Sequence, residues 1–236
     1  MVQEVVHAQK IAMLGYGPDV RDEAIRLRAA GMSVTVAVRH GGMSWLRALG
    51  DGFRPVSHED AVEGADAVVV KIPERELPAL FAQSVAPVIR PGALVVFAKA
   101  SPVLAEIVAL PEQVDVALVV TARGTGRVAV HQDATGSALA RATRYAELAT
   151  GAARIVTTTF ADCMGEELAR LVAEAGGVEQ AIARCDRVLE SPGHEPDEAV
   201  LVYYEHLRQE LRQGRAPSSR QSGLFVTEPP SKRGAA

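Results

Sequence analysis

Two glycines and an arginine are the residues whose types and spacing point most directly to chemistry in this sequence. Gly15-Tyr16-Gly17 follows a short apolar run at 11–14, and a second β-branched run at 34–38 ends on Arg39 with Ser44 close behind. A pyrophosphate must approach backbone N–H groups at a helix N-terminus, and a side chain at the contact position would block it. Arg39 stands where a dinucleotide-binding βαβ unit recognises a 2′-phosphate. The spacing therefore predicts a site for NADP(H).

The turn departs from the complete dinucleotide-binding fingerprint at two positions. The third glycine of G-x-G-x-x-G would fall at Val20, and Asp19 places a carboxylate beside the expected pyrophosphate. That carboxylate repels the phosphates unless it caps the helix and points away, and Arg21 can offset its charge. We therefore expect weaker or altered cofactor binding. The alternative is a simple strand-to-helix turn with Arg39 facing solvent.

Short β-branched runs alternate with helical patterns through the first two thirds of the chain. Parallel strands need crossover connections, so the alternation predicts an α/β fold: a Rossmann-type, mostly parallel sheet with helices on both faces. We expect strands at 10–15, 33–38, 66–71, 93–98, 114–120, 126–131 and 153–157. The expected helices are 18–30, 43–50, 58–64, 73–89, 102–109 and 136–149.

After Thr159 the pattern contains helices only, with apolar residues every three or four positions. We expect an NADP-binding Rossmann-like domain at 1–158, a helical domain at 159–215 and a flexible tail at 216–236. Three short helices give limited cover for apolar faces such as Leu201, Tyr204 and Leu207, which favours a homodimer whose cleft is completed across the interface.

Composition argues against several classes of function. The formal net charge of −4 and the absence of a basic cluster argue against a nucleic-acid-binding face. No apolar run approaches the ~20 residues that span a bilayer, and the first residues lack the pattern of a secretory signal. Cys163 and Cys185 have neither metal-ligand spacing nor a CxxC arrangement. We expect a cytoplasmic protein with reduced thiols and a small-molecule substrate.

Several segments together resemble one known family. They are IAMLGYG, VAVRHGGMSW, the DGF at 51–53, ADAVVVKIPE, VAPVIRPGALVVFA, VAVHQDATGSALARATRYA, and TTTF followed by an acidic helix. In this order the chain resembles the short form of ketol-acid reductoisomerase, an NADPH- and magnesium-dependent family of branched-chain amino-acid synthesis. The resemblance spans most of the chain, far more than a generic Rossmann fold would share.

The resemblance implies a set of cofactor contacts. Arg39 and Ser44 would bind the 2′-phosphate, and a second serine of the family is replaced by Gly42. Pro73 would lie along the nicotinamide side of the cleft. The cofactor-binding residues that we expect are Gly15, Tyr16, Gly17, Arg39, Ser44 and Pro73.

The same resemblance implies that the family's metal chemistry is damaged here. An Asp and a Glu that bind magnesium match Glu166 and Arg170, although Glu167 can replace Glu166 if the gap is placed differently. Arg170 would repel a divalent cation. The partner subunit's two glutamates match Val202 and His206.

Two further departures affect the catalytic groups. The family's histidine after the VVFA strand is Lys99, and the loop with its catalytic lysine is deleted between Thr121 and Gly126. Five losses directed at one reaction indicate a chain that no longer isomerises.

We therefore predict a metal-independent NADPH-dependent reductase of a small C=O or C=N substrate. Its catalytic residues would be Lys99 as proton donor, with Glu166 and His206 lining the pocket, and it would have no metal site. For Lys99 the alternative is a solvated lysine at a strand end. A non-catalytic NADP-binding accessory protein and an authentic magnesium-dependent reductoisomerase are the other interpretations.

Three neighbouring residues need an interpretation of their own. Lys71 ends a strand at the same edge, where it is either a pocket residue or a surface lysine. His131 resembles a catalytic group in isolation, but we interpret its HQD turn as structural. Asp133 would cap the helix that begins near Gly136.

Overall fold

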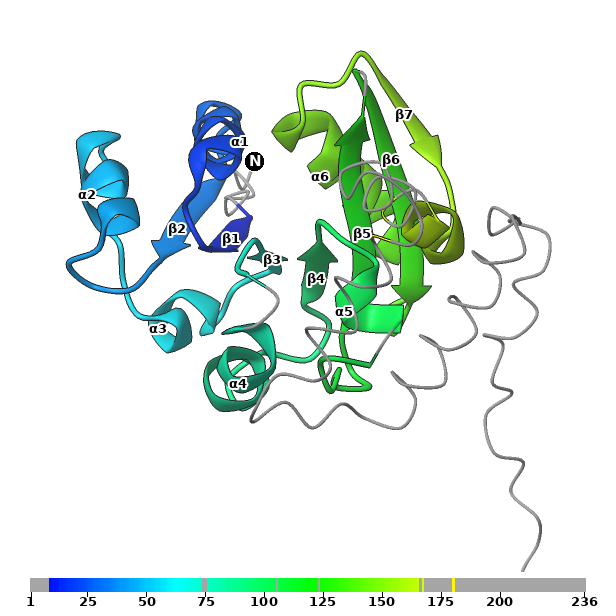
Figure 1. Cartoon of the computed structure of the whole chain (residues 1–236), viewed down its shortest axis with the longest axis horizontal. Coiled ribbons are helices and arrows are strands. Elements are labelled where there is room, and N and C mark those ends of the chain that lie inside the picture. Colours follow the sequence, from blue (N-terminus) through cyan, green and yellow to red (C-terminus); the bar gives the residue numbers. More distant parts are fainter. Residues whose placement is uncertain are drawn as a thin grey trace, which may run out of the picture. The chain divides into compact units, whose positions relative to one another are not determined.

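The computed structural model (Figure 1) describes residues 9–73, 76–104, 106–122, 124–165, 167 and 180. The chain divides into two compact units, Met1–Phe160 and Ala161–Ala236, and the first contains nearly all of the described residues. The helical domain and the tail that we expect from the sequence lie almost entirely outside the described residues. Among those described, no helix is long and apolar enough to cross a membrane.

Seven strands form one sheet in the order β2-β1-β3-β4-β5-β6-β7 (Figure 1). Strands β1 to β5 are parallel, β6 is antiparallel to β5, and β7 is parallel to β6. All seven predicted strands are present, and the mostly parallel Rossmann-type sheet is confirmed. Their bounds are β1 Lys10–Leu14, β2 Ser33–Ala37, β3 Ala67–Val70, β4 Leu94–Phe97, β5 Asp115–Ala122, β6 Thr125–Gln132 and β7 Arg154–Thr157.

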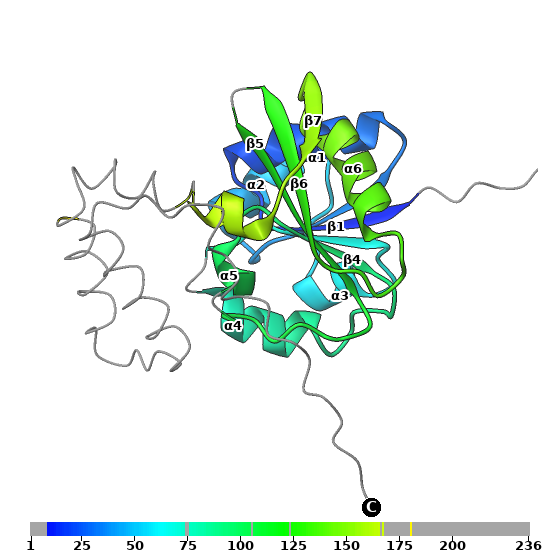
Figure 2. The same cartoon turned by 90° about the vertical axis from the view of Figure 1, so that its right-hand side faces the viewer.

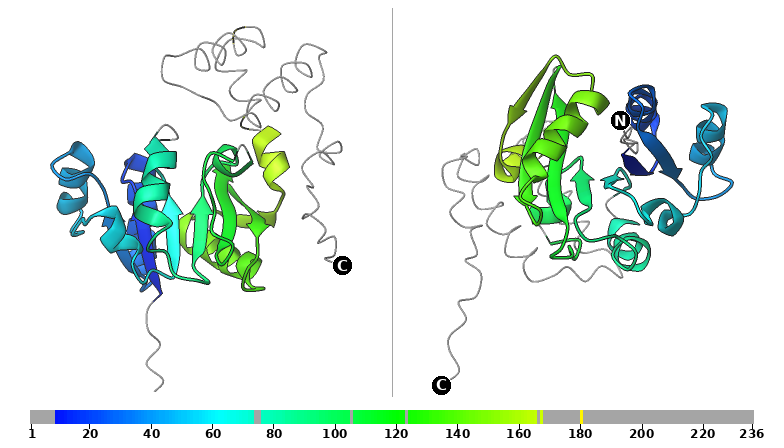
Figure 3. Two further views of the ribbon diagram at one scale, coloured as in Figure 1. Left: turned by 90° about the horizontal axis from the view of Figure 1, so that it is seen from below. Right: turned by 180° about the vertical axis from the view of Figure 1, so that it is seen from behind.

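Helices cover both faces of this sheet. Figure 2 shows α1 and α6 on one side of the parallel strands and α3 and α4 on the other, and Figure 3 shows α2 beyond the β2 edge. The helices are α1 Pro18–Ala29, α2 Met43–Gly50, α3 His58–Val62, α4 Leu77–Leu80 with a π-helical turn at Phe81–Val85, α5 Ser101–Leu104 and α6 Ala138–Ala149.

Two predicted helices are shorter than the sequence pattern indicated. The segment 73–89 is helical only from Leu77 to Val85, where α4 passes into the π-helical turn. The segment 102–109 ends at Leu104, and Glu106 adopts a positive φ of 50° that a right-handed helix does not contain. Apolar spacing alone did not reveal either end.

The central strands β1, β3 and β4 are buried on both faces over nearly their whole length, which explains their nearly continuous apolar sequences. In β1, Ile11 and Met13 belong to the core cluster that contains α1 and α6 residues such as Leu27 and Tyr145. Ala12 and Leu14 alternate with them, are fully buried, and so face the opposite helices. Only glycine turns and polar residues at the strand ends are left to form a site.

The carboxyl ends of β1, β2, β3 and β4 lie at one edge of the sheet. From β1 the chain moves to β2 on one side and then returns to β3 on the other side, so the topology switches direction between β1 and β3. Open α/β sheets bind ligands outside such a switch point. We call this the cofactor edge, and it carries Gly15–Gly17, Arg39, 71–73 and Lys99.

The HQD turn lies at the opposite edge and is structural, as predicted. The backbone N–H of Ala138 donates to Asp133 Oδ1 at 2.9 Å, so Asp133 caps the start of α6. Nearby, the buried Asp115 accepts hydrogen bonds from Thr135 and from Arg141 Nη1 at 2.7 Å. These contacts fix the start of α6 against the sheet.

A buried polar network ties α1, β3 and α6 together behind the cofactor edge. Glu23 on α1 is 6% exposed and accepts a hydrogen bond from the Tyr145 hydroxyl on α6. Its second oxygen lies 3.1 Å from Lys71 Nζ, directly after β3. Burial and the Glu23 charge raise the pKa of Tyr145 well above its usual value, so the phenol keeps its proton and donates.

We expect Tyr145→Phe to destabilise the fold while preserving its shape. Glu23 would keep its ion pair with Lys71 but lose the hydrogen bond from the buried Tyr145 hydroxyl. This loss should lower the free energy of unfolding by about 1.5 kcal/mol. Urea denaturation measures the loss. Glu147→Gln, which breaks an exposed pair with Arg144 on the same helix, is the control and should change stability by less than about 0.5 kcal/mol. Equal effects of the two substitutions would contradict the structural role of the network.

Candidate functional site

The two glycines of the first turn have different physical roles. Gly15 has a φ of +100°, and a Cβ there would lie closer to the Lys71 carbonyl oxygen than real Cβ atoms come. Its N–H donates to the carbonyl of Ala37 at 2.9 Å. The fold itself therefore requires glycine at 15, because β1, β2 and β3 converge on it.

Gly17, in contrast, faces open space. It is the N-cap of α1 with a φ of −82°, a conformation that any residue adopts. In the described part of the chain, a Cβ built there meets no atom within 4 Å, and no side chain caps the helix. The start of α1 is thus an uncapped helix N-terminus with room in front of it, as an anion requires.

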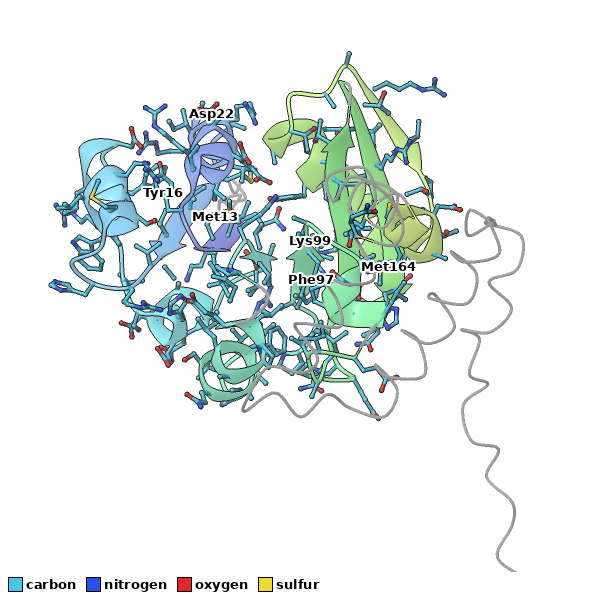
Figure 4. All side chains as sticks on the ribbon, viewed as in Figure 1. Met13, Tyr16, Asp22, Phe97, Lys99 and Met164 are labelled. Carbon is cyan, nitrogen blue, oxygen red and sulfur yellow. The ribbon has the colours of Figure 1, made fainter. Side chains whose placement is uncertain are left out.

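Tyr16 contributes only its main chain to this turn. Its side chain is 1% exposed, lies between α1 and α2 (Figure 4), and packs edge-on against Phe53 with ring centroids 5.7 Å apart. The hydroxyl donates to Asp51 Oδ2 at 3.0 Å. Burial, followed by this hydrogen bond, raises the pKa of Tyr16 to about 12. The phenol is therefore a core group and not a ligand contact.

Arg21, which the sequence suggested could offset Asp19, pairs with Asp51. Its guanidinium binds Asp51 in a bidentate manner, with Nη2 2.7 Å from Oδ1 and Nε 2.8 Å from Oδ2. This pairing, ahead of the smaller effect of Tyr16, lowers the pKa of Asp51. Asp19 stays exposed in the first turn of α1. Its carboxylate interacts favourably with the positive end of the helix dipole and repels a bound phosphate.

The turn after β2 presents a cation and a second helix N-terminus. The Arg39 side chain is 84% exposed, and its Nη2 lies 3.1 Å from Glu76 Oε2. Gly42 is the N-cap of α2 and makes no side-chain capping bond, and Ser44 stands half-buried in the first turn. The guanidinium, the hydroxyl and the backbone N–H groups of this turn all suit a phosphate.

The ends of β3 and β4 supply the remaining residues of the cofactor edge. Lys71 is not a surface lysine, since its side chain is only 19% exposed and pairs with Glu23. Pro73 is exposed two residues later. Lys99 is exposed beyond the end of β4, close to the buried Phe97 (Figure 4).

β5 and β6 form a hairpin at the cofactor-edge end of β5. Ala122 pairs with Thr125, so β5 and β6 are joined by two residues. This is the position where the resemblance implies a deleted loop with a catalytic lysine.

The other residues assigned to catalysis or metal binding lie outside the described part of the chain: Glu166, Arg170, Val202 and His206. Across 9–73, 76–104, 106–122, 124–165, 167 and 180, no group of three or more His, Cys, Asp or Glu side chains could hold a metal ion.

Sequence reasoning did not identify three acidic residues that organise this edge: Glu23, Asp51 and Glu76. Glu23 carried a usable signal, because it lies three residues after Val20 and next to Ala24, on the apolar side of α1. An acid among buried helix positions needs a partner. Asp51 and Glu76 had no such signal, since their arginine partners are distant in sequence.

Comparisons with known proteins agree with this geometry. Residues 5–166 match the family model described as acetohydroxy acid isomeroreductase, NADPH-binding domain. Ketol-acid reductoisomerase (NADP(+)) of Pyrobaculum islandicum is 34% identical, over 87% of this chain and 66% of that protein. The corresponding protein of Sulfurisphaera tokodaii is 33% identical, over 84% and 64%. The chain thus spans 64–66% of the length of these two relatives.

Solved structures share the fold. An NADH-preferring ketol-acid reductoisomerase from an uncultured archean superimposes with a TM-score of 0.64 at 24% identity, covering 87% of this chain and 70% of that one. The 3-hydroxyisobutyrate dehydrogenase of Mycobacterium tuberculosis gives a TM-score of 0.58 at 21% identity, covering 78% and 65%. The chain belongs to the ketol-acid (acetohydroxy acid) reductoisomerase family, and its first 166 residues contain the family's NADPH-binding domain.

Proposed function

We propose that this chain binds NADP(H) at the cofactor edge and reduces a small C=O or C=N substrate without a bound metal ion. The open, uncapped N-terminus of α1 beside the β1–β3 switch point is the observation that carries the proposal. Its family and its NADPH-binding domain support the cofactor. The substitutions at the family's metal and catalytic positions support the metal-free chemistry.

The residues at the first turn fit a pyrophosphate. Gly15 must be glycine for the fold, but among the described residues nothing fills the space that a side chain at Gly17 would occupy. A bound phosphate would use that space and accept from the uncapped N–H groups of α1. Asp19 opposes this binding by charge repulsion, so the affinity should be modest.

The residues after β2 fit a 2′-phosphate. Arg39 supplies a charge-assisted donor, and Ser44 supplies a hydroxyl. Gly42 lacks the hydroxyl of the family's second serine, but its place at the N-cap of α2 leaves backbone N–H groups open to the same phosphate. The helix terminus would thus compensate in part for the lost side chain.

The bound cofactor would supply a hydride to the substrate. Pro73 would bound the nicotinamide side of the site, and Lys99 would donate a proton to the substrate oxygen or nitrogen. Both are exposed at adjacent strand ends. Glu166 and His206 would complete the pocket. Because the unliganded Lys99 is exposed, its role as donor depends on bound cofactor and substrate covering it.

Two other functions are alternatives that the experiments below distinguish. A non-catalytic NADP-binding protein is favoured by Val20 and Asp19 in the fingerprint and by the β5–β6 hairpin. A magnesium-dependent ketol-acid reductoisomerase is favoured by the names of the relatives, about a third of whose length this chain does not cover.

Alanine at the two glycines should separate stability from binding. Gly17→Ala should leave the thermal midpoint within about 2 °C and weaken NADPH binding at least roughly tenfold, because only a ligand approaches that position. Gly15→Ala should instead lower the midpoint, since its Cβ would meet the Lys71 carbonyl. Thermal unfolding and calorimetry measure the two effects. Unchanged NADPH affinity in a folded Gly17→Ala protein would refute the pyrophosphate site.

Calorimetric titration with NADPH and NADH, with and without magnesium, tests the proposed function. We expect NADPH binding that ignores magnesium and weakens by roughly 10- to 100-fold in Arg39→Ala, because one charged hydrogen bond to the 2′-phosphate is lost. NADH binding should change little in that variant. Glu147→Gln is the matched surface control.

The outcomes distinguish the alternatives. NADPH binding followed by turnover of a small carbonyl or imine without magnesium supports the reductase. Tight binding without turnover of any tested carbonyl or imine identifies a binding protein, and turnover that requires magnesium identifies a reductoisomerase. If neither nucleotide binds, the proposal fails.

The homodimer also follows from the proposed pocket, because His206 would enter it from the partner. Light scattering of the full chain should give twice the monomer mass of 25.0 kDa. A strict monomer at all concentrations would remove His206 from the site and leave Lys99 and Glu166 as its candidates.

A further inference from the structure

The arginine expected to bind the 2′-phosphate is already held by a carboxylate. Arg39 Nη2 lies 3.1 Å from Glu76 Oε2, and the Glu76 side chain is 35% exposed. Arg39 follows β2, and Glu76 comes just before α4, after β3. Since β1 lies between β2 and β3 in the sheet, the ion pair links the two strand ends that flank the glycine turn.

We propose that Glu76 is a specificity-determining residue that sets the preference between NADP(H) and NAD(H) by competing with the 2′-phosphate for Arg39. This inference rests on the proposed function. In the nucleotide-free chain the Glu76 carboxylate pairs with the Arg39 guanidinium, and the 2′-phosphate of NADP(H) must displace this carboxylate. NAD(H) has no 2′-phosphate, so its binding does not require Arg39 to be released.

Charge explains why the two cofactors respond differently. A 2′-phosphate near Arg39 also lies near the Glu76 carboxylate, and like charges at this separation repel. The ribose 2′-hydroxyl of NAD(H) can donate a hydrogen bond to a carboxylate at this position. Glu76 therefore opposes one cofactor and tolerates or assists the other.

The neighbouring imidazole does not add a compensating charge. His58 begins α3 and is affected by the Arg39 guanidinium. Burial, with a smaller contribution from Arg39, lowers the pKa of His58, so it is neutral at pH 7. The Glu76 carboxylate and an incoming phosphate therefore compete for the Arg39 charge.

Glu76→Gln tests the proposal, because it removes the charge and keeps the side-chain shape. Calorimetry should show NADPH binding tighter by roughly three- to tenfold, with NADH binding unchanged or weaker. The gain should disappear in the Arg39→Ala background, where there is no guanidinium to release. Glu147→Gln, which breaks the exposed Arg144–Glu147 pair on α6, should change neither affinity.

The results separate this inference from the proposed function. Equal changes for both nucleotides, or no change for NADPH, would overturn the role of Glu76 while leaving the NADP(H) site intact. NADPH binding by Glu76→Gln but not by the unmodified chain would support it strongly. If neither protein binds either nucleotide, the proposed function and this inference both fail. A thermal midpoint that stays constant in Glu76→Gln confirms that the effect is on binding and not on folding.

Discussion

The close approach of the chain at Gly15 to the carbonyl of Lys71 is the constraint on which the cofactor edge depends. It brings the turn after β1 against the end of β3, at the point where the sheet changes direction. The side chain of Lys71 then reaches Glu23, which also holds Tyr145. Lys71 thus connects the glycine turn with α1 directly and with α6 through Glu23, and these contacts set the direction in which α1 leaves the turn.

The charges of the cofactor edge are balanced before any nucleotide binds. Asp51 forms an ion pair with Arg21, and Glu76 forms one with Arg39. The two pairs differ in what they do: Asp51 also accepts from the buried Tyr16 and belongs to the framework, whereas the Arg39–Glu76 pair is exposed. An exposed pair contributes little to stability and is easily exchanged for a better ligand. The structure therefore combines a fixed turn with a replaceable counter-ion.

The family relationship explains the scaffold better than the chemistry. The sheet, the glycine turn and the helix cap at Asp133 all lie within residues 5–166, which match the family's NADPH-binding domain. The short β5–β6 hairpin stands where the resemblance places a catalytic loop. Cofactor binding needs only the strand ends and two helix N-termini, so it can survive changes that a metal-dependent rearrangement cannot.

Local patterns in the sequence determined the seven strands, the start of α1 and the structural role of the HQD turn. These follow from apolar periodicity, glycine positions and short-range capping, which operate over a few residues. Tertiary structure alone decided the partners of the charged groups. Arg21 meets Asp51 across 30 residues, and Arg39 meets Glu76 across 37. The sequence predicted that Arg39 faces a phosphate, but it could not show that the Glu76 carboxylate pairs with this arginine. Such a pairing depends on the order of strands in the sheet, and strand order is a property of the whole fold.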